Sequence, residues 1–181
     1  MHIAVGITGA SGAPIAVSLL RALSEHEVSL VVTPEGERIL ALEAGEADLP
    51  AAHRYHYADF TSPLASSSRA PDAMVICPCS MRSLAAIAHG LSDNLITRCA
   101  DSMLRLRRPL VLVPRETPLS QPALDNLRLL ASYGAQIVPP MLTYYFQPQS
   151  VQDLTDFAAG KVLDCLGVAH RLYRRWAEEQ P

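Results

Sequence analysis

Short apolar runs alternate with amphipathic stretches along most of the sequence. Residues 3–7 form a nearly continuous apolar run, whereas residues 14–23 carry apolar side chains three and four positions apart. The first pattern is typical of a strand buried on both faces, and the second indicates a helix with one buried face. The beginning of the chain therefore predicts a strand followed by a helix.

The same alternation continues toward the C-terminus. Further strands are expected at residues 28–33, 55–58, 74–77 and 109–113. Further helices are expected around residues 39–42 and at 81–89, 93–106, 119–133 and 151–166. The least regular part is 45–72, which contains a serine-rich run.

Strands separated by helices of this length favour an α/β fold with a mostly parallel sheet. We expect a single doubly wound domain over residues 1–181, of Rossmann-like or flavodoxin-like type, with helices on both faces. The C-terminal helix, about 151–176, is expected to pack at the active site or at a subunit interface.

Composition narrows the class of protein. With 49% hydrophobic and 18% charged residues, the 181-residue chain can form one substantial core. Its net charge of -3 argues against nucleic acid or an anionic membrane as the main partner. No apolar run approaches the roughly 20 residues of a membrane span. The chain begins as a strand without a basic leader, so we expect a cytoplasmic protein without a signal peptide.

Cysteine and histidine give no sign of a metal site. The four cysteines suggest no disulfide framework in such a context. Cys77 and Cys79 alternate at the end of an expected strand, but two ligands without a nearby histidine or second cysteine pair do not make a site. We therefore expect no metal.

The glycine-rich segment after the first strand is a candidate binding loop. Gly6, Gly9 and Gly12 have the spacing G-x-x-G-x-x-G, which differs from the G-x-G-x-x-G of dinucleotide binders. Glycines allow close backbone approach, and the following helix start presents unpaired N–H groups to an anion. The second strand ends at Thr33 without an acidic residue at its tip. A mononucleotide is favoured, although a tight strand-to-helix turn also needs glycine.

The fourth strand ends in Pro78-Cys79-Ser80-Met81-Arg82-Ser83. Two hydroxyl groups and an arginine at a helix start suit an anion or the polar edge of a ring. The alternative is that Ser80 is only the N-cap of the helix.

The strand at 109–113 leads into Arg115 and Glu116, then Thr117 and Pro118. Ligands of parallel α/β sheets gather beyond the carboxyl ends of the strands. An arginine suits a phosphate there, and a carboxylate suits proton transfer. The alternative is a solvated ion pair in a loop.

Several residues outside these loops are also candidates. Arg98 and Arg105 lie seven positions apart on one helix, which suits either a ligand or a solvated or interface stripe. Tyr145 precedes a proline-containing loop, where it could cover a ligand or simply fill the core. Lys161 lies within the last helix.

Together these segments resemble the flavin prenyltransferase family of the UbiX type, within the superfamily of flavin-binding cysteine-decarboxylase-like proteins. The resemblance covers nearly the whole chain. It rests on residues 6–12, 78–81, 92–98, 107–119 and 148–150.

The resemblance implies a metal-independent transferase. Such an enzyme joins a dimethylallyl group from dimethylallyl monophosphate to N5 and C6 of reduced FMN. It would pass the prenylated FMN to a UbiD-type decarboxylase, and it would act as a homo-oligomer, expected here to be a dodecamer. It would need neither nucleic acid nor a membrane.

The resemblance also implies roles for residues of this chain. The FMN contacts would be Gly9, Ala10, Ser11, Thr33, Ser80, Met81, Arg82, Ser83 and Arg115. The substrate phosphate would be bound by Tyr145, Lys161, Arg98 and Arg105. Glu116 and Ser11 would act in proton transfer, and Trp176 with Tyr145 would supply a dry wall for the allyl cation.

The chain departs from the family pattern at three places. Arg105 stands where lysine is common, and Lys161 where arginine is common. The positive charge is therefore retained at both positions, but the planar guanidinium that can form two parallel hydrogen bonds is gained at Arg105 and lost at Lys161. Residues 65–69 replace a more usual Ser-Gly-Ser-Phe-like turn.

Two alternative functions stay open at this point. One is an FMN-dependent cysteine decarboxylase of the same fold, although that branch typically has Pro-Ala-Ser-Ala-Asn where this chain has residues 78–82. The other is an FMN-binding accessory subunit of a decarboxylase, which would not need residues for a prenyl phosphate.

Overall fold

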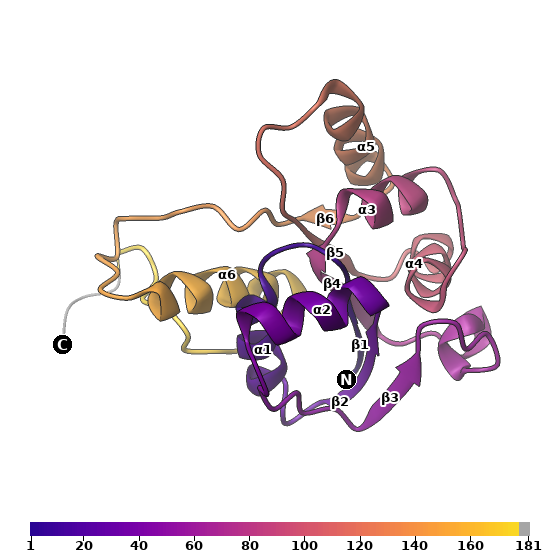
Figure 1. Cartoon of the computed structure of the whole chain (residues 1–181), viewed down its shortest axis with the longest axis horizontal. Helices are drawn as coiled ribbons and strands as arrows, with labels where there is room; N and C mark the ends of the chain where they lie inside the picture. The colour runs from indigo at the N-terminus through magenta and orange to yellow at the C-terminus, as the bar shows by residue number, and fades with distance from the viewer. Residues whose placement is uncertain (178–181) are drawn as a thin grey trace.

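The structure is a computed structural model that describes residues 1–177. It is built around a six-stranded parallel sheet with the strand order β3-β2-β1-β4-β5-β6 (Figure 1). The strands are β1 (His2–Ile7), β2 (Glu27–Val32), β3 (His53–His56), β4 (Ala73–Cys79), β5 (Leu110–Pro114) and β6 (Gln136–Ile137). The predicted α/β class with a parallel sheet is confirmed.

Helices connect these strands and cover both faces of the sheet (Figure 1). They are α1 (Ala13–Ala22), α2 (Pro34–Glu43), α3 (Met81–Ala88), α4 (Leu95–Leu106), α5 (Gln121–Ser132) and α6 (Val151–Leu166). Two single-turn helices, η1 (Pro63–Ala65) and η2 (Ser67–Arg69), occupy the serine-rich run between β3 and β4. Among residues 1–177, no helix is both long and apolar enough to cross a membrane.

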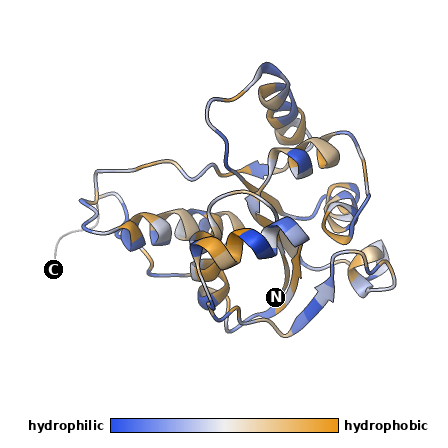
Figure 2. Ribbon diagram, viewed as in Figure 1, coloured by the Kyte–Doolittle hydropathy of each residue, from blue (hydrophilic) through white to orange (hydrophobic). Residues whose placement is uncertain are grey.

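Alternate residues of the central strands enter two separate cores. In β1, Val5 packs with α1 and α6 on one face, while Ala4 packs with α3 and α4 on the other. In β4, Val75 and Ile76 divide in the same way. Because both faces are buried, these strands are apolar along their whole length. The edge strand β3 is hydrophilic by contrast (Figure 2).

The expected strands and helices are present, and most of their ends lie within two residues of the predicted positions. The second helix was expected around 39–42, but α2 begins earlier, at Pro34. The fourth strand was expected to stop at Cys77, but β4 continues through Pro78 to Cys79 after a shift in its pairing with β5. The expectation of helix as far as 176 is wrong. Helix α6 ends at Leu166, where Gly167 takes a left-handed conformation with φ of 69°.

The carboxyl ends of the parallel strands all lie at one edge of the sheet. The loops that follow β1, β2, β4 and β5 therefore converge there. These loops carry the glycine-rich segment, Thr33, Ser80 and the Arg115–Glu116 pair. The fold thus assembles most of the predicted flavin contacts at one edge.

Candidate functional site

A cavity of about 420 Å³ lies at the carboxyl edge of the sheet. It is lined by Thr8, Gly9, Thr33, Pro34, Glu35, Tyr57, Ser80, Arg82 and Ser83. Five of the predicted FMN contacts line it, from three different strand ends: Gly9, Thr33, Ser80, Arg82 and Ser83. We call this cavity the carboxyl-edge pocket.

Gly9 is required for the close approach of the first two loops. A Cβ atom at Gly9 would lie 2.4 Å from the Cβ of Glu35, at the start of α2. Thr33 caps the same helix, because its hydroxyl accepts a hydrogen bond from the Gly36 N–H at 3.1 Å. The pocket wall formed by α2 therefore depends on the absence of a side chain at Gly9.

Thr8 joins the loops after β1 and β4, and sequence reasoning missed it. Its side chain is almost fully buried. The Thr8 hydroxyl donates to the Pro78 carbonyl at 2.9 Å and accepts from the Ser80 N–H at 2.7 Å. The Thr8 N–H donates to the same carbonyl at 3.2 Å, so backbone and side chain of one residue link two loops about 70 residues apart. The only sequence signal was a threonine beside Gly9 in the binding loop.

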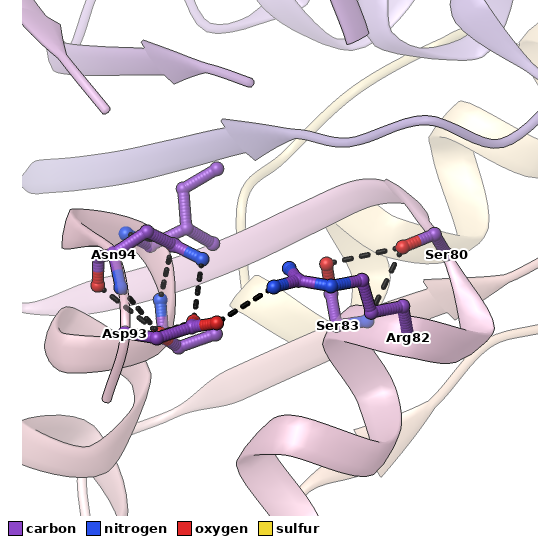
Figure 3. A network of polar contacts seen from close by, with 7 residues as sticks. Ser80, Arg82, Ser83, Asp93 and Asn94 are labelled. Carbon is purple, nitrogen blue, oxygen red and sulfur yellow. Dashed lines mark hydrogen bonds and ion pairs between the residues drawn. The ribbon is translucent and has the colours of Figure 1, made fainter. Parts of the chain in front are cut away.

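The start of α3 is capped and linked to the start of α4 (Figure 3). The Ser80 hydroxyl accepts from the Ser83 N–H at 3.2 Å, as the N-cap alternative expected. Arg82 Nη2 lies 2.7 Å from Asp93 Oδ2. Asp93 also accepts from the Asn94 amide at 2.9 Å, and Asn94 caps α4. Capping and pocket lining are therefore compatible roles for this segment. Met81 is partly buried against the core that contains α3 and α4.

Glu43 binds the N-terminus of α1 and was also missed by sequence reasoning. Its Oε2 accepts from the N–H groups of Gly12 at 2.8 Å and Ala13 at 3.0 Å. Burial alone would raise the pKa of Glu43. Hydrogen bonds from the Ser11 hydroxyl and the two amides, together with the charge of Arg115, instead bring this pKa below its ordinary value.

These contacts place Ser11 and Arg115 around one carboxylate. Nothing in the sequence near Glu43 indicates this role, because the contact joins the end of one helix to the start of another. Ala10, between Gly9 and Ser11, is buried and donates its N–H to the Thr8 carbonyl at 2.8 Å.

Arg115 and Glu116 follow β5 directly, and both side chains are exposed. The Glu116 carboxylate accepts from the adjacent Thr117 N–H at 3.0 Å. An exposed carboxylate at this edge remains accessible to a ligand, whereas a carboxylate in a buried ion pair would not.

Tyr145 and Lys161 belong to an aromatic cluster formed by α6 and the segments on either side of it. The Tyr145 ring centroid lies 5.1 Å from that of Trp176 and 6.1 Å from that of Phe157. Lys161 Nζ lies 5.2 Å from the Phe157 centroid and 4.7 Å from the Tyr173 centroid. The structure thus brings Tyr145, Trp176 and Lys161 together, as expected.

Arg98 and Arg105 occupy different places along α4. Arg98 Nε donates to the Ala65 carbonyl at 3.0 Å and so ties the serine-rich segment to α4. Arg105 Nε lies 3.0 Å from Asp101 Oδ2. Seven residues of helix separate the two arginines by roughly 10 Å along the axis.

Arg105 lines a second cavity, of about 1080 Å³, at the amino edge of the sheet. Arg107, Arg108 and Tyr133 line the same cavity. Arg105 therefore lies at the edge opposite the carboxyl-edge pocket. A site that uses Arg105 together with that pocket requires two copies of the chain.

Within residues 1–177, no group of three or more His, Cys, Asp or Glu side chains is arranged to hold a metal ion. Burial raises the pKa of the Cys79 thiol to about 12 and raises that of Cys77 as well. Both thiols are therefore protonated at neutral pH, which disfavours metal ligation.

Comparisons with known proteins agree with this geometry. A family model described as Flavoprotein matches residues 1–163. The chain is 43% identical over 187 residues to flavin prenyltransferase UbiX of Chlamydia pneumoniae, with 97% of each chain covered. It is 41% identical over 199 residues to flavin prenyltransferase UbiX of Pseudomonas aeruginosa, with 98% of this chain and 95% of the relative covered.

Two solved structures are similar over nearly their whole length. A dodecameric FMN-dependent UbiX-like decarboxylase from Escherichia coli O157:H7 has a TM-score of 0.93 and 40% identity, with 98% of this chain and 100% of that chain covered. AnUbiX (PadA1) in complex with FMN and dimethylallyl pyrophosphate has a TM-score of 0.93 and 37% identity, with 99% and 98% covered.

Proposed function

The chain belongs to the flavin prenyltransferase family of flavoproteins, and on this premise we propose that its substrates are reduced FMN and dimethylallyl monophosphate. The dimethylallyl group is joined to N5 and C6 of the flavin, and inorganic phosphate is released. The observation that carries this proposal is the carboxyl-edge pocket, where five predicted FMN contacts meet.

The residues of the pocket fit FMN. Gly9 allows close backbone approach, and the start of α3 presents N–H groups together with the hydroxyls of Ser80 and Ser83. The Thr33 hydroxyl accepts its capping hydrogen bond and keeps its own proton free to donate to a phosphate oxygen. We propose that Arg115 binds the FMN phosphate as well, with Ala10, Ser11, Met81 and Arg82 completing the contacts.

We assign proton transfer to Glu116, supported by its exposure at the ligand edge. A positioned carboxylic acid can pass a proton to the departing phosphate, and the resulting carboxylate can then take up the proton that is lost when the new ring closes. Ser11 is assigned as a relay, because its hydroxyl donates to Glu43. Glu43 then fixes the Ser11 hydroxyl and the N-terminus of α1.

The prenyl phosphate is assigned to Tyr145 and Lys161. A cation and a hydroxyl absorb the charge of the leaving phosphate as the allylic C–O bond breaks. Trp176 and Phe157 lie beside Tyr145, and such an aromatic wall excludes the water that would capture an allyl cation. Arg98 and Arg105 complete the phosphate site in this proposal.

The position of Arg105 supports a site shared between copies of the chain. We propose a closed homo-oligomer in which α4 of one copy reaches the pocket of another. The similar protein from E. coli O157:H7 is described as dodecameric, which makes a dodecamer the expected assembly. The product is proposed to pass to a UbiD-type decarboxylase in the cytoplasm.

The cysteine decarboxylase alternative is less well supported. A PPC decarboxylase mutant in complex with pantothenoylaminoethenethiol is 26% identical, with a TM-score of 0.60 and 77% of this chain covered. The UbiX-type relatives are more similar and cover more of the chain. An accessory FMN subunit would need the carboxyl-edge pocket but not the arrangement around Lys161.

A parallel assay distinguishes these functions. FMN-loaded protein is reduced anaerobically and given dimethylallyl monophosphate, dimethylallyl pyrophosphate or phosphopantothenoylcysteine. We expect phosphate release and loss of the free reduced flavin spectrum with the monophosphate. Carbon dioxide release from the cysteine substrate alone would instead establish the decarboxylase, and no reaction with any of them would favour the accessory subunit.

A further inference from the structure

Lys161 is the only lysine in this chain. The sequence has 15 Lys and Arg residues in all, so arginine supplies every other permanent cation of the side chains. A chain that otherwise uses arginine throughout has an ammonium group at this one position. The surroundings of Lys161 show what distinguishes the position.

The ammonium group lies over two aromatic rings. Lys161 Nζ is 5.2 Å from the Phe157 ring centroid and 4.7 Å from the Tyr173 centroid, both within the range of a cation–π contact. The two rings contact each other, with centroids 4.8 Å apart, so the ammonium lies over a pair of packed rings. The Lys161 side chain is still 42% exposed, so a ligand can reach it.

The Asp164 carboxylate contacts four side chains, one of which is Lys161. Its Oδ1 accepts from Arg175 Nη2 at 2.7 Å and lies 3.0 Å from His170 Nε2. Its Oδ2 accepts from the Tyr173 hydroxyl and lies 3.7 Å from Lys161 Nζ. Three of these partners come from residues 170–175, which follow α6 and fold back along it (Figure 1).

The charge of Asp164 is largely directed at residues other than Lys161. Arg175 and the Tyr173 hydroxyl make the short contacts, while Lys161 stands at the longest distance. Lys161 is therefore oriented by Tyr173 and Asp164 without being neutralised in a tight ion pair. Its positive charge remains directed at the exposed side, where an anion can bind.

Gly160 makes room for this arrangement. A Cβ atom at Gly160 would lie 2.5 Å from Tyr173 Cδ1 and 2.7 Å from His170 Cε1. Glycine inside a helix costs about 1 kcal/mol relative to alanine. The chain keeps glycine here because any larger residue would push Tyr173 and His170 away from α6.

We propose that Asp164 and Tyr173 are positioning residues that orient the Lys161 ammonium group toward the prenyl phosphate. Gly160, which has no side chain, leaves the space that Tyr173 and His170 need beside α6. The inference rests on the proposed function, since it assigns the phosphate of dimethylallyl monophosphate to Lys161. It adds that the segment 170–175 is a structural part of the phosphate site.

Variants of the positioning residues test the proposal. Asp164→Asn removes the negative charge that faces all four partners, and Tyr173→Phe removes the hydroxyl that donates to Asp164, each with little change of shape. Gly160→Ala displaces the whole arrangement. Asp156→Asn is the matched control: it alters another α6 carboxylate, which bonds Ser18 and Gln152 instead. Binding of dimethylallyl monophosphate to the protein loaded with oxidised FMN is measured by calorimetry, and turnover is measured with reduced FMN.

The three test variants are expected to weaken binding of the monophosphate on the order of 10-fold, because the cation loses its orientation. The loss should appear in KM more than in kcat, and FMN affinity should stay within about two-fold of the wild type in each variant. Asp164→Asn is decisive. If Asp164 acted only through its charge, removing it would strengthen binding of an anion, and that result would overturn the proposal.

A second measurement does not depend on activity. Because Lys161 is the only lysine, protein labelled at lysine Cε gives one lysine signal by nuclear magnetic resonance. The signal should shift strongly on Tyr173→Phe and Gly160→Ala, and titration with inorganic phosphate should move it in the wild type. A lysine signal unchanged in all three variants would refute the positioning role.

The two measurements separate this inference from the proposed function. A wild type that binds dimethylallyl monophosphate through Lys161 but does not transfer the prenyl group supports the positioning role and contradicts the proposed reaction. Normal prenylation by all three variants, with unchanged KM, supports the proposed reaction and contradicts the positioning role.

Discussion

The buried hydroxyl of Thr8 accepts a hydrogen bond from the Ser80 N–H at 2.7 Å and donates one to the Pro78 carbonyl at 2.9 Å. It thereby joins the end of β1 to the end of β4, two neighbouring strands whose loops both line the carboxyl-edge pocket. Together with the hydrogen bond from the Thr8 N–H to the same carbonyl, it fixes the position of Ser80 relative to Gly9.

Thr8→Val is therefore expected to weaken FMN binding and to destabilise the protein. The change leaves the Ser80 N–H without its partner and removes one of the two hydrogen bonds to the Pro78 carbonyl, which still accepts from the Thr8 N–H at 3.2 Å. The expected cost is about 1–3 kcal/mol of unfolding free energy. Fluorescence titration with FMN and denaturant unfolding measure the two effects. Thr8→Ser keeps the hydroxyl and serves as the control. Wild-type FMN affinity in Thr8→Val would show that the two loops are held in place independently.

Glu43→Gln tests the carboxylate at the start of α1. An amide oxygen can still accept from Gly12 and Ala13, but the negative charge that interacts with Ser11 and Arg115 is lost. We expect nearly normal folding, retained FMN binding and prenylation slowed by at least about 10-fold. Single-turnover rates with saturating FMN provide the measurement. Glu37→Gln, an exposed change on the same helix, should have no effect.

Glu116→Gln keeps the size and reach of the side chain but cannot exchange a proton. FMN should bind as in the wild type, while prenylation slows by about 10²-fold or more. Turnover at the wild-type rate would remove Glu116 from the mechanism.

The opposite locations of Arg105 and the carboxyl-edge pocket predict complementation between copies. Arg105→Ala and Arg82→Ala, which change one residue of each cavity, should each be nearly inactive when pure. Oligomers assembled from equal amounts of both should recover about a quarter of the wild-type activity, because one site in four then combines the two intact residues. Absence of recovery, with confirmed mixed oligomers, would mean that both residues act within the same copy.

The elements of the fold follow from the sequence because the central strands are buried on both faces. Val5 and Ala4 enter opposite cores, so the apolar run that contains them is continuous and easily recognised. The segment after α6 could not be placed as well: the helix at 151–166 was predicted, but its expected extension to about 176 is absent. Residues after Gly167 are held on the helix by Asp164, and such side-chain contacts leave no periodic pattern in the sequence.

The site was predictable where function depends on a local loop, and less so where it depends on contacts between distant elements. Gly9 and Ser80 follow strands and have side chains typical of ligand loops, so their role was visible. Thr8 and Glu43 act on partners from other elements, and their types alone are unremarkable. For Arg105, the sequence pattern predicted the helix and the face of the helix on which Arg105 lies. It did not show that this end of the helix lies at the amino edge of the sheet.

The central claim, that this chain prenylates FMN, is tested most directly by the mass of the flavin. Protein is incubated anaerobically with reduced FMN and dimethylallyl monophosphate, and the bound flavin is released and analysed by mass spectrometry. We predict that it gains the mass of one dimethylallyl unit, and that the gain is lost in Glu116→Gln over the same time. Unmodified FMN after prolonged incubation of the wild type with both substrates bound would contradict the claim.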